Sequence, residues 1–216
     1  MRALALFDQG PFPPCPRPFN MAGHTFSAAD RAPERVALEV LSAPGAVSAH
    51  WTHATLAEAV RRTAGGLAAR GLGKGDRVLL RIGASVEFPI LFFAANALGA
   101  IPVPTSALLT EPEVRANLDD LAPRLICVGV GVAAPTGASA PILDPDDLAA
   151  LTAFDPAPFA ATDPDDPAYI VYASGTSGRP KGVIHAQRAA WARRMMWDGW
   201  YGLTPDDRVL HAGAFN

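Results

Sequence analysis

Short apolar strands alternate with helical segments between residues 55 and 129, and this order restricts the fold more than any other feature of the chain. Runs of branched apolar residues predict strands at 77–82, 101–103 and 125–129. Helices are expected between them at 86–98 and 111–121. Strands joined by helices in this way form right-handed crossovers between parallel strands. The sequence therefore predicts an α/β fold, a layered βαβ-type domain with a mostly parallel sheet.

The helix that precedes the strand at 77–82 has the clearest amphipathic pattern. Thr55 is its expected N-cap, and Gly71 is expected to end it. Before this helix, a β-hairpin is expected from residues 36–41 and 48–51, and a short helix at 27–32 with Ser27 as its N-cap. The face of the long helix that is predicted to be buried carries Leu56, Ala59, Val60, Thr63 and Leu67.

Changes in composition predict four regions. Proline is frequent between residues 10 and 20, which favours an extended arm. The predicted regions are the arm at 1–20, a first α/β subdomain at 21–143, an acidic, proline-rich bridge at 144–167, and the truncated beginning of a second subdomain at 168–216. Within the last region we expect strands on either side of a loop near 172–183, a helix at 188–201, a turn at 204–207 and a strand at 208–211.

Composition excludes several function classes. Half of the 216 residues are hydrophobic, which is typical of a globular protein, and the formal net charge of −3 offers no basic field for nucleic acid. The uncharged stretch 88–109 is interrupted by Pro89, Gly99 and Pro102, so a buried core segment is expected in place of a membrane span. No targeting segment is visible, and a cytoplasmic location is predicted.

The two cysteines, Cys15 and Cys127, are too few and too isolated for a disulfide framework or a metal site. Two free thiols in a reducing compartment are expected. No metal-binding cluster is visible in the sequence, so we predict no metal held by the protein alone.

Residues 172–183 read YASGTSGRPKGV and follow the apolar run Ala168-Tyr169-Ile170-Val171. The segment combines three aliphatic hydroxyls, three glycines and Lys181. A loop of this composition presents backbone N–H groups, hydroxyl donors and a positive charge to one point, which suits polyphosphate. Glycine lets the main chain approach an anion closely. The sequence predicts a phosphate-binding loop; an ordinary Ser/Gly surface turn is the alternative.

The Walker A loop does not fit this spacing. That motif places Gly before its lysine, Ser or Thr after it, and a helix from there on. Here Pro180 precedes Lys181, Gly182 follows it, and the β-branched continuation Val183-Ile184 predicts a strand. The loop is therefore expected to connect two strands.

The string YASGTSGRPKGVIHAQR resembles the phosphate-binding signature of the adenylate-forming enzymes, a superfamily of acyl- and aryl-CoA synthetases, peptide-synthetase adenylation domains and firefly luciferase. Ala173 departs from the signature, which often has Thr or Ser there, so a contact at this position would come from the backbone. Residues 51–56 and 98–104 resemble weaker motifs of the same superfamily in the same order. The resemblance covers most of residues 20–216 and implies the N-terminal part of the superfamily's large domain.

The resemblance implies a ligase that uses ATP and Mg²⁺ to activate a carboxylic acid as an acyl-adenylate and passes the acyl group to coenzyme A. Lys181 and Thr176 are the expected catalytic residues, because the departing pyrophosphate must be held and its charge dispersed. The metal ion is expected to arrive with the nucleotide. The residues expected to bind the cofactor are Ser174, Gly175, Thr176, Ser177, Gly178 and Lys181.

Other polar and aromatic residues receive weaker assignments. Phe215 and Asn216, near His211, lie where the superfamily places an element of its substrate pocket. His185 is expected to be structural. The aromatic residues of the last helix are expected to form core and surface faces: Trp191, Trp197, Trp200 and Tyr201.

No segment resembles the later motifs of the superfamily, which include the ribose-binding aspartate and the lysine of the small C-terminal domain. We therefore expect the 216-residue chain alone to have little or no ligase activity. Two alternatives to a carboxylate:CoA ligase remain: a non-catalytic nucleotide- or anion-binding fragment, and part of a peptide-synthetase adenylation domain. The identity of the carboxylic acid stays open.

Overall fold

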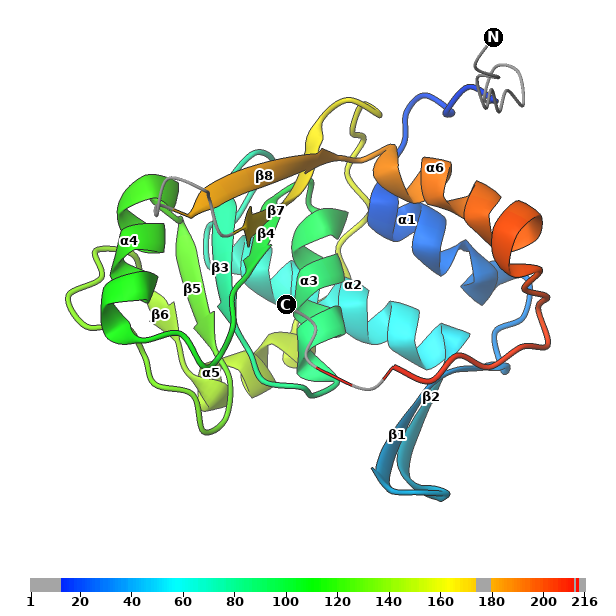
Figure 1. Ribbon diagram of the computed structural model, residues 1–216, viewed down its shortest axis with the longest axis horizontal. Helices are drawn as coiled ribbons and strands as arrows, with labels where there is room; N and C mark the ends of the chain where they lie inside the picture. Colours follow the sequence, from blue (N-terminus) through cyan, green and yellow to red (C-terminus); the bar gives the residue numbers. More distant parts are fainter. Residues whose placement is uncertain (1–12, 174–179, 212, 214–216) are drawn as a thin grey trace, which may run out of the picture.

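The computed structural model describes residues 13–173, 180–211 and 213, and Figure 1 shows the arrangement of the elements. A four-stranded parallel sheet in the order β4-β3-β5-β6 forms the centre. Its strands are β3 (Arg77–Arg81), β4 (Ile101–Pro104), β5 (Leu125–Val128) and β6 (Ile142–Leu143). Val78 is paired with Pro102 on one side and with Leu125 on the other. The predicted α/β fold with a parallel sheet is confirmed.

Helices cover both faces of this sheet. Alternate residues of a strand point to opposite sides, so β3 and β5 each contribute to two core clusters. On one face Val78 and Leu80 pack with residues of α2 (His53–Ala69) and α3 (Glu87–Ala97). On the other face Leu79 packs with residues of α4 (Glu111–Leu121). Within the uncharged stretch 88–109, α3 and β4 (Ile101–Pro104) therefore contribute to the core, as expected, whereas Leu108 is 92% exposed. In the part of the chain described here, no helix is both long and apolar enough to cross a membrane.

Helix α2 has the predicted buried face but a different start. Leu56, Val60 and Leu67 are buried in the core. The N-cap is Thr52, whose side-chain oxygen accepts a hydrogen bond from the Thr55 backbone N–H. The Thr55 hydroxyl oxygen in turn accepts a hydrogen bond from the Thr52 backbone N–H. Thr55 was predicted as the N-cap and is instead the third residue of the helix, because this reciprocal pair satisfies two backbone donors.

The N-terminal helical segment also begins earlier than predicted. Helix α1 (Met21–Thr25) is capped by Asn20, whose side chain accepts from the Gly23 N–H, and a 3-10 turn (Phe26–Asp30) continues it. The predicted helix at 27–32 overlaps this turn, but its predicted N-cap, Ser27, lies inside the turn because the turn continues from α1. The hairpin of β1 (Val36–Ala43) and β2 (Ala46–Thr52) is confirmed.

The predicted bridge contains folded structure. Helix α5 (Pro145–Ala150), capped by Asp144, leads into a 3-10 turn (Leu151–Ala153). Leu151 is fully buried against α2, where Gly66 leaves room for its backbone. This segment therefore packs on the first subdomain, while the division of the chain at residues 144–167 remains a prediction.

An antiparallel hairpin of β7 (Pro167–Ala173) and β8 (Lys181–Ala186) follows, with β7 packed beside β4. Helix α6 (Ala189–Met196) and a π-helical turn (Trp197–Tyr201) lie near α1 (Figure 1). The turn at 204–207 is confirmed by hydrogen bonds from Thr204 to the Asp207 carboxylate. Residues 208–211, predicted as a strand, form none in the described part of the chain. Val209 and Leu210 pair with no strand and are 72% and 75% exposed.

Candidate phosphate site

The hairpin of β7 and β8 holds both ends of the predicted phosphate loop. Tyr172 is paired with Gly182 and Ala173 with Lys181, so the two strands are in register up to the loop. The expectation of a loop between two strands is met by these flanking elements. Most of the predicted ligands lie outside the described residues, namely Ser174, Gly175, Thr176, Ser177 and Gly178.

Lys181 is the first residue of β8, and it is exposed at the exit of the loop. The chain has one other lysine, Lys74, which pairs with the Asp166 carboxylate over 2.8 Å. That ion pair and a hydrogen bond from the Asp163 backbone hold the pKa of Asp166 below its usual value. Lys181 makes no ion pair within the described residues, so its charge remains available to an anion.

Strand β7 is fixed to the parallel-sheet layer through buried contacts. Ala168 is fully buried, and its carbonyl oxygen accepts a 2.9 Å hydrogen bond from Nδ2 of Asn96 at the end of α3. Ile170 packs in the same core cluster as Leu79 and Val114. The entry strand of the loop is therefore rigidly attached, since a buried hydrogen bond in a low-dielectric core is costly to break.

Strand β8 has a more exposed surface. Val183 and Ile184 are 46% and 63% exposed, while the His185 ring stacks on Tyr169 with centroids 4.4 Å apart. The stacking is consistent with the structural part expected for His185. The next turn is buried again at Gln187, which accepts a hydrogen bond from the Met21 N–H over 2.7 Å.

Tyr172 contacts the loop exit and α4 together. Its phenol donates a 2.8 Å hydrogen bond to Oδ2 of Asp120. Its ring lies beside Gly182, where an added Cβ would be 3.6 Å from the ring. Burial, with the hydrogen bond to Asp120, raises the pKa of the Tyr172 phenol, so the hydroxyl stays protonated and donates.

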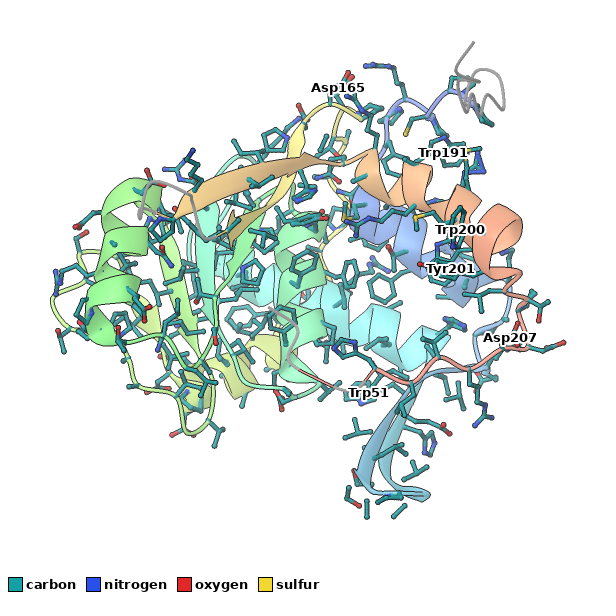
Figure 2. All side chains as sticks on the ribbon, in the orientation of Figure 1. Trp51, Asp165, Trp191, Trp200, Tyr201 and Asp207 are labelled. Carbon is teal, nitrogen blue, oxygen red and sulfur yellow. The ribbon has the colours of Figure 1, made fainter. Side chains whose placement is uncertain are left out.

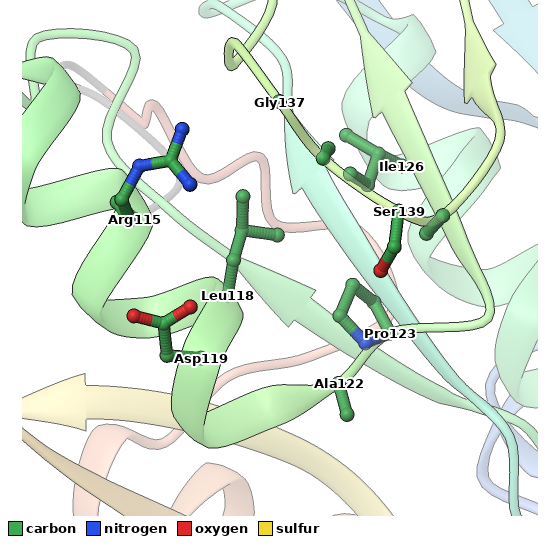
Figure 3. Close-up of a pocket in the computed structure, with 10 residues that line it drawn as sticks. Arg115, Leu118, Asp119, Ala122, Pro123, Ile126, Gly137 and Ser139 are labelled. Atoms are coloured by element: carbon green, nitrogen blue, oxygen red, sulfur yellow. The ribbon is translucent and has the colours of Figure 1, made fainter.

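Two cavities among the described residues lie away from the predicted phosphate site, and none of its residues lines either of them. One of about 240 Å³ lies between α4 and residues 137–140, with Arg115, Asp119 and Ser139 on its wall (Figure 3). The other, of about 380 Å³, is lined by apolar residues near Phe19 and Phe159, with His24 and Asn20. No group of His, Cys, Asp and Glu suited to a metal ion occurs in the described ranges.

Some of the remaining predicted residues lie outside the described part of the chain, and others lie on α6 or near the end of the chain. Phe215 and Asn216, the predicted substrate residues, lie outside the described residues, and His211 is exposed. Trp191 packs against Phe19 and under the Arg194 guanidinium, whose carbon lies 3.4 Å from the ring centroid. Figure 2 shows Trp191, Trp200 and Tyr201 on α6 and the turn after it, and the last two are 78% and 60% exposed.

Sequence reasoning did not identify three residues that support the hairpin. Asn96 carried a signal, because an amide in an otherwise apolar helix needs a partner. Asp120 and Gln187 carried no such signal in the sequence. The partner of Asp120 is Tyr172, 52 positions away, and the partner of Gln187 is Met21, 166 positions away.

Comparison with known proteins identifies this arrangement. The model of the AMP-binding enzyme family matches residues 25–215, and the chain belongs to that family. It is 33% identical over 171 residues to the long-chain-fatty-acid–CoA ligase FadD13 of Mycobacterium tuberculosis. The matched region covers 74% of this chain and 34% of that ligase. It is 34% identical over 178 residues to the 4-hydroxybenzoate–CoA/benzoate–CoA ligase of Rhodopseudomonas palustris, and this match covers 74% of this chain and 33% of that ligase.

The relatives include peptide synthetases as well. Tyrocidine synthase 2 of Brevibacillus parabrevis is 29% identical over 162 residues, covering 74% of this chain and 4% of the synthetase. The crystal structure of ATP-bound MatB from Rhodopseudomonas palustris superposes with a TM-score of 0.75 at 28% identity, covering 87% of this chain and 39% of that one. The chain spans about a third of the length of the CoA ligases that it matches and corresponds to their N-terminal portion.

Proposed function

We propose that this chain supplies the phosphate-holding part of an ATP-dependent carboxylate:CoA ligase of the AMP-forming type. The observation that supports this most directly is the β7–β8 hairpin, which brackets the SGTSG sequence and leaves Lys181 exposed without an ion pair among the described residues. The reaction proposed for the whole enzyme is activation of a carboxylic acid by ATP, followed by transfer of the acyl group to coenzyme A.

In this proposal each residue of the loop has a physical task. Lys181 supplies a mobile positive charge that follows the departing pyrophosphate. The hydroxyls of Ser174, Thr176 and Ser177 donate hydrogen bonds to phosphate oxygens. Gly175 and Gly178 allow backbone N–H groups to approach the anion. Phe215 and Asn216 are proposed to face the carboxylic acid.

Magnesium is proposed to arrive with the nucleotide. When bound, the ion would neutralise phosphate charge. The protein groups proposed here hold the phosphates themselves.

Coenzyme A is proposed as the acceptor because two of the relatives are named as CoA ligases of fatty and aromatic acids. A carrier protein, as in peptide synthetases, is the second candidate, supported by the likeness to tyrocidine synthase 2. The acid itself is proposed only as a fatty or aromatic carboxylic acid. A cytoplasmic location is part of the same proposal.

The chain offers an internally controlled test of the phosphate site, because its only amine side chains are Lys74 and Lys181. An amine-reactive label, read by mass spectrometry of peptides, should modify Lys181 less when Mg²⁺-ATP or pyrophosphate is present. Labelling of Lys74, which is paired with Asp166, should not change. Equal labelling of Lys181 with and without these ligands would refute the proposed site.

A second measurement addresses activity. Carboxylate-dependent exchange of pyrophosphate into ATP should be at background for the 216-residue chain alone, because it corresponds to about a third of the ligases it matches. Lys181→Ala should weaken pyrophosphate binding about tenfold or more, since a charge-assisted contact to phosphate is lost. Substantial exchange by the isolated chain would overturn the expectation of inactivity.

A further inference from the structure

Tyr172 contacts both the loop exit and α4. It stands one residue from the end of β7, directly across from Gly182 of β8. A Cβ added at Gly182 would come within 3.1 Å of the Ile170 side chain and 3.6 Å of the Tyr172 ring. The glycine therefore allows the exit strand to lie close to this ring.

The hydroxyl at the far end of the ring is fixed to another element. It donates over 2.8 Å to Oδ2 of Asp120, near the end of α4. Helix α4 is itself attached to the sheet through Val114 and Leu121, which are buried in the core. The loop entry is thus connected to a rigid helix by a single directed bond.

We propose that Tyr172 and Asp120 are positioning residues for the phosphate loop, an inference that rests on the proposed function. The hydrogen bond sets the direction of the tyrosine ring, and the ring sets the distance between β7 and β8 where the loop begins and ends. Neither residue contacts the phosphate in this proposal. Their effect is to hold Ala173 and Lys181 at a fixed separation before a ligand binds, which reduces the ordering cost of binding.

The carboxylate of Asp120 should have two opposing effects on phosphate binding. A carboxylate close to an anion-binding loop repels phosphate, so its presence there needs a compensating contribution. A charged acceptor gives a stronger hydrogen bond than a neutral one, and the phenol supplies the donor. Removing the bond and removing the charge should therefore have opposite effects on phosphate affinity, and substitutions can separate them.

The test compares pyrophosphate binding by calorimetry in the intact 216-residue chain and its variants. Tyr172→Phe keeps the ring and removes the bond, and it should weaken binding about two- to tenfold. Asp120→Ala should weaken it less, because loss of the repelling charge offsets loss of the bond. Asp120→Asn keeps an acceptor oxygen and removes the charge, so it should bind at least as tightly as the wild type.

Two matched controls accompany these variants. Asp119→Asn makes the same charge change on the neighbouring residue, which lines the cavity of Figure 3 and makes no bond to Tyr172. Tyr201→Phe removes an exposed phenol elsewhere. Both should bind pyrophosphate like the wild type. A loss of affinity in Tyr201→Phe equal to that of Tyr172→Phe would overturn the proposal.

Hydrogen exchange without ligand separates this inference from the proposed function. NMR should show faster exchange of the Ala173 and Lys181 amides in Tyr172→Phe and Asp120→Ala, and wild-type rates in Asp120→Asn. If these amides change while the wild type binds no pyrophosphate, the positioning contact stands and the proposed function fails. Unchanged exchange in Tyr172→Phe overturns the inference, whatever the binding result.

Discussion

The backbone N–H of Met21 donates to Oε1 of Gln187 over 2.7 Å, which joins two residues 166 positions apart. The amide of the same side chain donates to the Pro167 carbonyl at 3.4 Å. Gln187 is fully buried and follows β8 directly. One side chain therefore connects the first residue of α1 with the first residue of β7 and the end of the hairpin that holds the loop.

Substitution of Gln187 should destabilise the fold. Gln187→Met keeps the side-chain length and removes both hydrogen bonds, so a buried N–H is left without its partner and the free energy of unfolding should fall by about 1–3 kcal/mol. Denaturant unfolding measures this. Ser48→Ala, on the exposed hairpin, removes a hydroxyl bonded to the Val40 carbonyl and should change stability by less than about 0.5 kcal/mol. A Gln187→Met variant as stable as the wild type would contradict this connection.

Alanine at Gly65 or Gly66 should destabilise the protein although alanine favours helices. A Cβ at Gly65 would lie 2.0 Å from the Asp155 carbonyl oxygen, and one at Gly66 would lie 2.8 Å from the Leu151 backbone. The expected loss is about 1–3 kcal/mol, which exceeds the helix-propensity gain of about 1 kcal/mol. Thermal or denaturant unfolding checks the sign. Gly199→Ala is the control, because a Cβ there meets nothing within 4 Å in the helical turn 197–201.

The parallel-sheet layer could be predicted closely because local pattern and tertiary environment agree there. The strands at 77–82, 101–103 and 125–129 match β3, β4 and β5 to within one residue at each end. Their runs of branched apolar residues are what a sheet buried on both faces requires. The two-residue β6 was not predicted, because so short a strand leaves no periodic pattern.

The errors occur where the local sequence pattern is compatible with more than one structure. Residues 208–211 have strand propensity but pair with no strand in the described chain, and propensity alone does not make a sheet. The start of α2 depended on whether Thr52 or Thr55 would accept the first N–H, and threonine suits either position. For the candidate site, the order of Ser, Gly, Pro and Lys predicted a loop between two strands, whereas the partners of Asn96, Asp120 and Gln187 are far away in the sequence.

The two thiols should differ sharply in reactivity. Cys127 is fully buried on β5, and burial raises its pKa to about 12, so almost no thiolate exists near neutral pH. Cys15 is partly exposed. A thiol reagent should titrate one group in the native protein and two in denaturant, and Cys15→Ser should abolish the native reaction. Equal native rates for both cysteines would contradict the burial of Cys127.

His24 should make stability depend on pH below neutrality. Its ring lies between Phe19 and Trp191, with centroids 5.1 and 5.7 Å away. Burial lowers the pKa of His24, and the charges of Arg194 and Arg31 lower it further. The unfolded chain, with a histidine pKa near 6.5, therefore binds the proton more readily than the folded protein. This contribution is fully present above about pH 6.5 and is lost as the pH falls through the lower pKa of the folded state.

The measurement for His24 is the free energy of unfolding at a series of pH values between about 7.5 and 5. His24→Phe keeps the aromatic packing and cannot be protonated, so its stability should fall less steeply over this range than that of the wild type. The difference between the two curves isolates the histidine from carboxylates, which titrate in both proteins. Parallel curves for the wild type and His24→Phe would show that the ring is protonated equally in both states.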